Sequence, residues 1–207
     1  MLSEIIEQAR NTSLAEAIAA ALGLAYLLLA VKRNLLCWFC AFVSTAIYLV
    51  LFAKAALYMQ SALQVFYLIM AVYGFIDWKA GRTEETGVLI RTWSARQHAL
   101  AVVAVTVATA INGWLLAKHT DAAAPYLDSF VTWSSVITTW MVARRVLENW
   151  LYWIVVDAIA AYLYFSQGLL WTTVLFVIYL GIVVHGYFVW RKERREQAKT
   201  EHAHVAA

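Results

Sequence analysis

Three residues that could recognise a cation share one face of an apolar segment late in the chain. Trp150, Trp153 and Asp157 are spaced i, i+3 and i+7, which places them on the same side of a helix. Asp157 is the eleventh residue of an apolar run of nineteen, over 147–165, so in a spanning helix it would lie near the bilayer centre. A carboxylate at that depth costs about 3 kcal/mol and usually marks a pathway or the counter-ion of a ligand.

The residue types on this face predict the chemistry of the guest. Indole faces attract cations, and a flat cation suits an indole best. An acid beside two tryptophans therefore predicts a flat, aromatic, positively charged substrate. The alternative is that Asp157 is a protonated or hydrogen-bonded structural acid.

An earlier apolar segment carries polar side chains with the same kind of spacing. Gln60, Gln64 and Tyr67 lie at i, i+4 and i+7, and amides within a membrane need partners. They could bind hydroxyls or an amide of a substrate. Gln64, nearer mid-span, is the stronger site residue, whereas interhelical hydrogen bonding explains Gln60 equally well.

Three further residues complete the candidate site. Asp128, near one end of a hydroxyl-rich segment, could draw a cation to the outer mouth. Asn112, in the segment 98–117, and Tyr179, in the segment 169–189, are weaker candidates.

Several chemistries have no residues to support them. The last apolar segment has no lysine for a retinal Schiff base, and the chain has no Walker-type loop and no Gly-x-Ser-x-Gly. No second catalytic group can be assigned opposite Asp157, and the tail histidines at 202 and 204 make an improbable metal site. We therefore expect neither an enzyme nor a bound metal or cofactor.

Composition places these residues in a membrane. The 207 residues are 63% hydrophobic and only 14% charged, against about a quarter charged in a globular protein. A spanning helix needs about 20 mostly apolar residues. Seven segments qualify, which predicts an all-α polytopic membrane protein: 14–31, 35–53, 56–76, 98–117, 126–142, 147–165 and 169–189.

Lysine and arginine are distributed unequally between the two predicted sides. Thirteen lie on one side, in the turns after the first, third, fifth and seventh segments, and three on the other. By the positive-inside rule the crowded side is cytoplasmic, so the N-terminus is outside and the C-terminus inside a bacterial inner membrane. Residues 1–13 then form a short interfacial segment and 191–207 a basic cytoplasmic tail. We assign Trp78, Trp93 and Trp190 to the aromatic belt at the membrane interface.

The chain contains an internal repeat. Shifted by 112 positions, residues 33–78 align without gaps on 145–190, and fifteen of the 46 pairs are identical. The identities include one Arg, one Tyr, one Gly and two Trp pairs, which apolar composition does not explain. The predicted transmembrane domain, 14–190, thus has repeat 1 (14–78), a linker helix (98–117) and repeat 2 (126–190). Parallel repeats are a transporter architecture with the substrate near the midplane.

Two motifs carry a family resemblance. The run Ser61-Ala62-Leu63-Gln64-Val65-Phe66-Tyr67 with Tyr73-Gly74 and Trp78, and the run Glu148-Asn149-Trp150-Leu151-Tyr152-Trp153, resemble the third and sixth helices of PnuC-type vitamin transporters. Asp128-Ser129 is also similar. The resemblance implies import of nicotinamide riboside, with relatives that carry thiamine or riboflavin, through a SWEET-like three-one-three fold. It further implies homotrimers, facilitated diffusion, and trapping of the substrate by a cytosolic kinase.

One position departs from the family pattern. Nicotinamide riboside carriers are expected to have Asn where this chain has Asp157. Nicotinamide riboside and thiamine are both flat cations, so the acid and the indoles do not separate them. We expect import of nicotinamide riboside by facilitated diffusion, with thiamine or another vitamin such as a flavin, or proton coupling through Asp157, as alternatives. The expected partners are the vitamin, the lipid bilayer and further copies of the chain, and no nucleic acid.

Overall fold

The computed structural model describes residues 2–54, 58–83 and 87–206 and is almost entirely helical. This confirms the predicted all-α class. The predicted start of the third segment, at 56, lies outside the described residues. The helices are α1 (Leu2–Asn11), α2 (Leu14–Val31), α3 (Leu36–Lys54), α4 (Tyr58–Ala80), α5 (Ala95–His119), α6 (Pro125–Ala143), α7 (Asn149–Ser166) and α8 (Leu170–Ala206).

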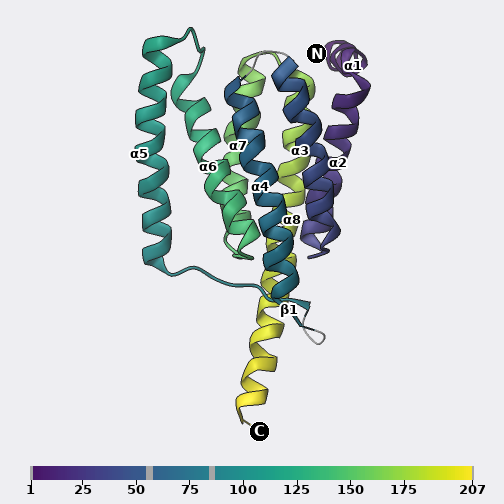
Figure 1. Ribbon diagram of the computed structural model, residues 1–207, viewed down its shortest axis with the longest axis vertical. Helices are drawn as coiled ribbons and strands as arrows, with labels where there is room; N and C mark the ends of the chain where they lie inside the picture. The colour runs from purple at the N-terminus through teal and green to yellow at the C-terminus, as the bar shows by residue number, and fades with distance from the viewer. Residues whose placement is uncertain (1, 55–57, 84–86, 207) are drawn as a thin grey trace.

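Two short strands follow α4 that are not predicted from the sequence. β1 (Arg82–Thr83) and β2 (Gly87–Val88) pair antiparallel within the polar run before α5. The basic tail, predicted as a separate segment, continues α8 as one helix beyond the bundle (Figure 1).

Six helices form a closed ring, seen from the side in Figure 1. Around the ring, α2 packs on α3, α3 on α4, α4 on α6, α6 on α7, α7 on α8, and α8 back on α2. The contacts of α4 with α6 and of α8 with α2 join the two repeats. The linker helix α5 packs mainly on α6 and stands at one side of the bundle (Figure 1).

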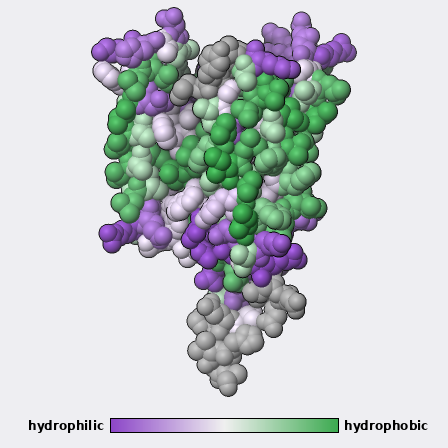
Figure 2. Space-filling model, viewed as in Figure 1, coloured by the Kyte–Doolittle hydropathy of each residue, from purple (hydrophilic) through white to green (hydrophobic). Residues whose placement is uncertain are grey.

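The surface of the ring is suited to lipid. Apolar side chains form a broad belt over the visible face, and hydrophilic side chains gather toward its two ends (Figure 2). Five helices, α2, α3, α4, α5 and α8, are long and apolar enough to cross a membrane. Helices α6 and α7 are of similar length, 19 and 18 residues, but carry more hydroxyl and polar aromatic side chains. The seven-span count therefore stays a prediction.

The turns after α2 and α6 have the same unusual backbone. Arg33 and Arg145, which are 112 positions apart, adopt left-handed conformations with φ of 54° and 63°. In both turns the next residue donates its N–H back into the helix, Asn34 to Leu29 and Val146 to Met141. This hydrogen-bond pattern commonly ends a helix. We call this end of the bundle, which carries Lys32, Arg33, Lys79, Arg144 and Arg145, the basic end.

Two tryptophans tie the repeats together at the basic end. Trp78 Nε1 donates to the carbonyl of Val142 at the end of α6, at 3.0 Å. Trp190 Nε1 donates to the carbonyls of Ala30 and Val31 at the end of α2, at 3.2 and 3.1 Å. Because Ala30 and Val142 are related by the same shift of 112, each repeat makes the same bond to the other.

Burial of these tryptophans corrects one prediction from the sequence. Trp78 and Trp190 are both 0% exposed and belong to the core, so neither lies in an interfacial belt. Each meets a repeat-related partner edge to face, Trp38 with Trp78 at 5.3 Å and Trp150 with Trp190 at 5.4 Å. Trp78 and Trp190 also contact each other at 5.8 Å. We call Trp38, Trp78, Trp150 and Trp190 the tryptophan quartet.

A buried ion pair joins the two repeats at the basic end. Arg145 Nε lies 2.9 Å from Asp77 Oδ2, and the Arg145 side chain is 3% exposed. Burial lowers the pKa of the Arg145 guanidinium, although the charge of Asp77 opposes that effect. Gly81 leaves the space that this guanidinium occupies, since a Cβ there would overlap the Arg145 side chain.

Two glycines of α8 provide a matched test of the packing around the quartet. A Cβ at Gly186 would lie 2.7 Å from Trp150 Cζ3, whereas a Cβ at Gly181 would meet nothing within 4 Å. Overpacking a core costs about 1–3 kcal/mol, and in a chain of this size each kcal/mol shifts Tm by about 2–4 °C. We expect Gly186→Ala to lower the Tm of the purified protein by about 3–10 °C, and Gly181→Ala to leave it unchanged or slightly raised. Equal Tm values for the two variants would contradict this packing.

Candidate functional site

The carboxylate of Asp157 is buried without a counter-ion. Asp157 is the ninth of the eighteen residues of α7 and is 4% exposed. Within the described ranges no lysine, arginine or histidine forms an ion pair with it, and no side chain donates a hydrogen bond to it. The hydroxyl of Tyr179 on the neighbouring helix α8 is close enough to interact with its charge. A buried charge without a partner is costly, and a positively charged group beside it would lower that cost.

The same face of α7 carries aromatic side chains on both sides of Asp157. Trp153 precedes it by four residues and Tyr164 follows it by seven, and both are partly buried. The ring of Tyr164 contacts Phe176 at 5.1 Å, and Phe176 contacts Tyr179 at 5.6 Å. The acid therefore lies among aromatic side chains of α7 and α8.

Polar groups from α4 and α6 complete the interior of the ring. Gln64 is 9% exposed, and its amide has no hydrogen-bond partner in the described part of the chain. The Tyr67 side chain on α4 lies close to Ser135 on α6. Asp128, two turns from Ser135 on the same face of α6, interacts electrostatically with Tyr164. These side chains could offer hydrogen bonds and a second negative charge.

Tyr67 and Tyr179 occupy repeat-related places in the interior. Tyr67 on α4 meets Ser135 on α6, and Tyr179 on α8 lies against Gly23 on α2, where an added Cβ would come within 3.2 Å of its hydroxyl. Gly23 and Ser135 are 112 positions apart, as are the tyrosines. Both junctions between the repeats therefore place a tyrosine hydroxyl at equivalent positions.

Three candidate residues have other surroundings. Trp150 is 1% exposed, and its ring packs between Gly186 and Trp190. Asn112 Nδ2 donates to Ser129 Oγ at 3.0 Å, which joins α5 to α6. Gln60 is partly buried one turn before Gln64 on α4. The placements of Trp150 and Asn112 indicate packing, and the residues gathered in the interior are Trp153, Asp157, Gln64, Tyr67, Asp128 and Tyr179.

Several side chains that share this interior are not among the residues predicted from the sequence. Tyr26 on α2 interacts electrostatically with Tyr67, and Tyr48 on α3 with Tyr164. Tyr164 and Ser135 could have been found from helical spacing. Tyr164 is seven residues from Asp157, and Ser135 is seven residues from Asp128. With them, every helix of the ring contributes a tyrosine or a hydroxyl to the interior.

The chemistry of this interior is that of binding. The described residues contain no group of three or more His, Cys, Asp or Glu that could hold a metal ion. Aromatic rings, one amide, hydroxyls and an unpaired carboxylate can hold a cation without forming a covalent bond. A closed ring of two parallel three-helix repeats around such an interior defines the class of a multi-pass membrane carrier.

Comparison with known proteins gives the family. The chain belongs to the nicotinamide mononucleotide transporter family, whose sequence model matches residues 13–192. It is thus a membrane transporter of a vitamin-transporter family and not an enzyme, which confirms the resemblance to PnuC-type proteins.

Individual relatives cover nearly the whole chain. The nicotinamide riboside transporter PnuC of Escherichia coli is 22% identical over 91% of this chain and 90% of its own. The riboflavin/roseoflavin transporter RibM of Streptomyces davaonensis is 29% identical over 86% and 84%. A crystal structure of the vitamin B3 transporter PnuC superposes with a TM-score of 0.74 at 24% identity, covering 94% of this chain and 90% of that one. The structural likeness establishes the fold.

Proposed function

We propose that this transporter carries a flat, cationic vitamin or vitamin precursor across a bacterial inner membrane by facilitated diffusion, and that nicotinamide riboside is its first candidate substrate. The observation that carries this proposal is the buried, unpaired carboxylate of Asp157 among aromatic rings. The pyridinium of nicotinamide riboside would supply the missing positive charge, and its ribose would meet the neighbouring amide and hydroxyls.

Each interior side chain has a role in this proposal. Trp153 stacks on the cationic ring, and Asp157 balances its charge or binds a ribose hydroxyl. Gln64 hydrogen-bonds the polar remainder of the substrate, and Tyr67 and Tyr179 flank it at the two repeat junctions. Asp128 attracts the cation at the outer mouth.

The wider setting follows from charge and family. The basic end faces the cytoplasm by the positive-inside rule, so the N-terminus lies outside. Phosphorylation by a cytosolic kinase would trap the substrate and keep the inward gradient. The chain would act as a homo-oligomer, a trimer by resemblance to its family.

A second candidate is thiamine, whose thiazolium is also a flat cation. Riboflavin is a third, favoured by the 29% identity to a riboflavin/roseoflavin transporter. Riboflavin is neutral, so it would leave the Asp157 charge unbalanced. The three vitamins therefore test the charge argument directly.

The deciding experiment is a binding and uptake screen. Purified protein is titrated with nicotinamide riboside, thiamine and riboflavin by calorimetry, with tryptophan fluorescence as a second readout. We expect nicotinamide riboside to bind tightest, thiamine more weakly and riboflavin least. Preference for riboflavin would contradict a cation site.

Uptake into proteoliposomes separates a uniporter from a proton-coupled carrier in which Asp157 relays the proton. The accumulated vitamin is measured with and without an imposed pH gradient. A uniporter equilibrates the vitamin to the same final level in both cases. Accumulation above equilibrium that depends on the gradient would establish coupling instead.

A further inference from the structure

A short extended segment crosses the basic end of the bundle between β2 and α5 (Figure 1). We call this segment, Val88 to Trp93, the strap. Two of its apolar side chains, Val88 and Ile90, are 3% and 4% exposed and belong to the same core cluster as the tryptophan quartet. The strap therefore covers the quartet at the end of the ring where the repeats are tied together.

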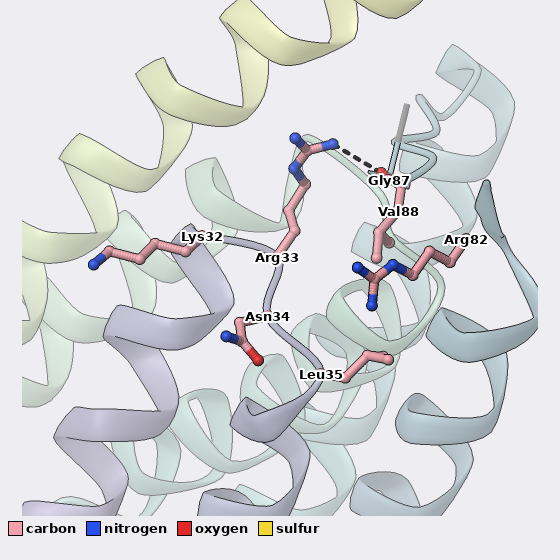
Figure 3. A pocket seen from close by; sticks show the side chains of 7 residues that line it. All are labelled: Lys32, Arg33, Asn34, Leu35, Arg82, Gly87 and Val88. Carbon is pink, nitrogen blue, oxygen red and sulfur yellow. Dashed lines mark hydrogen bonds between the residues drawn. The ribbon is translucent and has the colours of Figure 1, made fainter. Parts of the chain in front are cut away.

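The strap is bonded to both repeats. Arg33, in the turn after α2, donates from Nη1 to the Val88 carbonyl at 3.0 Å (Figure 3). In the turn after α6, the Arg91 N–H donates to the Arg145 carbonyl, and the Leu147 N–H donates to the Arg91 carbonyl, each at 2.8 Å. Movement of one repeat against the other would break the strap's hydrogen bonds either to the turn after α2 or to the turn after α6.

A single side chain beyond the bundle holds the centre of the strap. Gln197 lies two turns past Trp190 on α8 and is 8% exposed. Its Oε1 accepts from the Ile90 N–H at 3.0 Å, and its Nε2 donates to the Val88 carbonyl at 3.2 Å. One turn earlier, Glu193 forms an ion pair with Arg33 at 2.7 Å. The extension of α8 thus holds both the strap and the turn after α2, which is itself hydrogen-bonded to the strap.

The strap has room to move and little internal structure. A cavity of about 270 Å³ adjoins it, between the turn after α2 and β2, and Val88 lines this cavity with Arg33 and Arg82 (Figure 3). Apart from one bridge to Val146, the strap residues after β2 form no helix or strand. The hold of the strap on the bundle therefore depends on the burial of Val88 and Ile90 and on its hydrogen bonds to the two turns and to α8.

We propose that the strap is the gate at the basic end of the transport path and that Gln197 is its latch. The proposal rests on the carrier function proposed above. With the latch formed, Val88 and Ile90 seal the ring over the tryptophan quartet. Release of the latch lets the strap swing toward the adjoining cavity and opens the interior to the basic side.

Accessibility of a cysteine in the strap tests the latch. Cys37 and Cys40 are first replaced by alanine. In that background Ile90→Cys reports opening of the strap. Leu89→Cys is the control for a position that is always accessible, because Leu89 is 38% exposed. The purified protein is labelled with a maleimide. Loss of two buried hydrogen bonds in Gln197→Ala should speed labelling at position 90 by about tenfold or more. Lys192→Ala, on the same helix with its side chain 79% exposed, should change nothing.

Transport tests the gate. In proteoliposomes we expect Gln197→Ala to change the initial rate of nicotinamide riboside uptake at least threefold while its dissociation constant stays within a factor of two. Unchanged labelling at position 90 would overturn the latch. Faster labelling with unchanged uptake would overturn the gate and leave a structural contact. Absence of uptake by the wild-type protein for nicotinamide riboside, thiamine and riboflavin alike would instead overturn the carrier function. Gln197→Glu keeps the acceptor for the Ile90 N–H, so its labelling rate at position 90 should lie between those of the wild-type protein and Gln197→Ala.

Discussion

The Asp157→Ala variant is expected to bind nicotinamide riboside at least tenfold more weakly than the wild-type protein. The substitution removes the only acid on the interior face of α7, which is the proposed counter-charge of the cationic ring beside Trp153. Trp153→Ala should have an effect of similar size, because a desolvated cation–π contact is worth about 2 kcal/mol. Calorimetric titration of both variants measures the loss.

Two companion variants sharpen this result. Thr45 is the repeat-related counterpart of Asp157, and Thr45→Ala serves as the control that should bind normally. Asp157→Asn keeps the shape and a hydrogen-bond acceptor but removes the charge. Recovery of binding in Asp157→Asn would mean that the side chain binds a hydroxyl and does not balance the ring charge. Wild-type affinity in both Asp157→Ala and Trp153→Ala would remove the basis of the site.

Truncation of either central tryptophan of the quartet is expected to cause the largest loss of stability. Trp190→Ala removes a fully buried ring and its hydrogen bonds to the end of α2, and Trp78→Ala removes the equivalent ring and its bond to α6. Such substitutions cost about 3–5 kcal/mol. A Tm decrease of about 10 °C or more should follow for each.

The control for these variants is Trp171→Ala, because Trp171 is 40% exposed. Its Tm should change by only a few degrees in the same detergent. Trp190→Phe keeps a ring but not the donor, so it separates packing from hydrogen bonding. Trp190 donates to two carbonyls and Trp78 to one, so the two Tm decreases can differ by the contribution of one hydrogen bond. A larger difference in Tm would show that the two contacts between the repeats are not equivalent.

Much of the fold could be predicted from periodicity and repetition. Long apolar runs identified every large helix, and the shift of 112 identified which helices correspond. The repeat also contained a signal that went unused: the aligned pair Arg33 and Arg145 marks two helix ends with the same left-handed backbone. The order of helices around the ring could not be predicted, because it depends on contacts between repeats, such as Trp78 with the end of α6.

The tryptophans show why residue type alone does not predict which aromatic side chains belong to the core, the interface or the site. Trp78 and Trp190 lie next to basic residues, which is typical of interfacial residues, yet both are buried because their indole N–H groups bond across the repeats. Trp150 and Trp153 are three residues apart, but only the ring of Trp150 packs against Gly186. The contact between Trp150 and Gly186 could not be predicted, because the two residues are distant in sequence. Spacing along α7 did place Asp157 on an inward face, since burial follows helical periodicity directly.

The reciprocal bonds of Trp78 and Trp190 bear on why a single carboxylate is present at the level of Asp157. Each three-helix unit holds both the donor and the acceptor of its contact, so two identical copies of one unit would close the same ring with exact two-fold symmetry. Such a dimer could place either no acid or a pair of acids at the level of Asp157. Covalent fusion through α5 lets the units differ, as Thr45 and Asp157 do, and so lets a symmetric scaffold carry one carboxylate at this level.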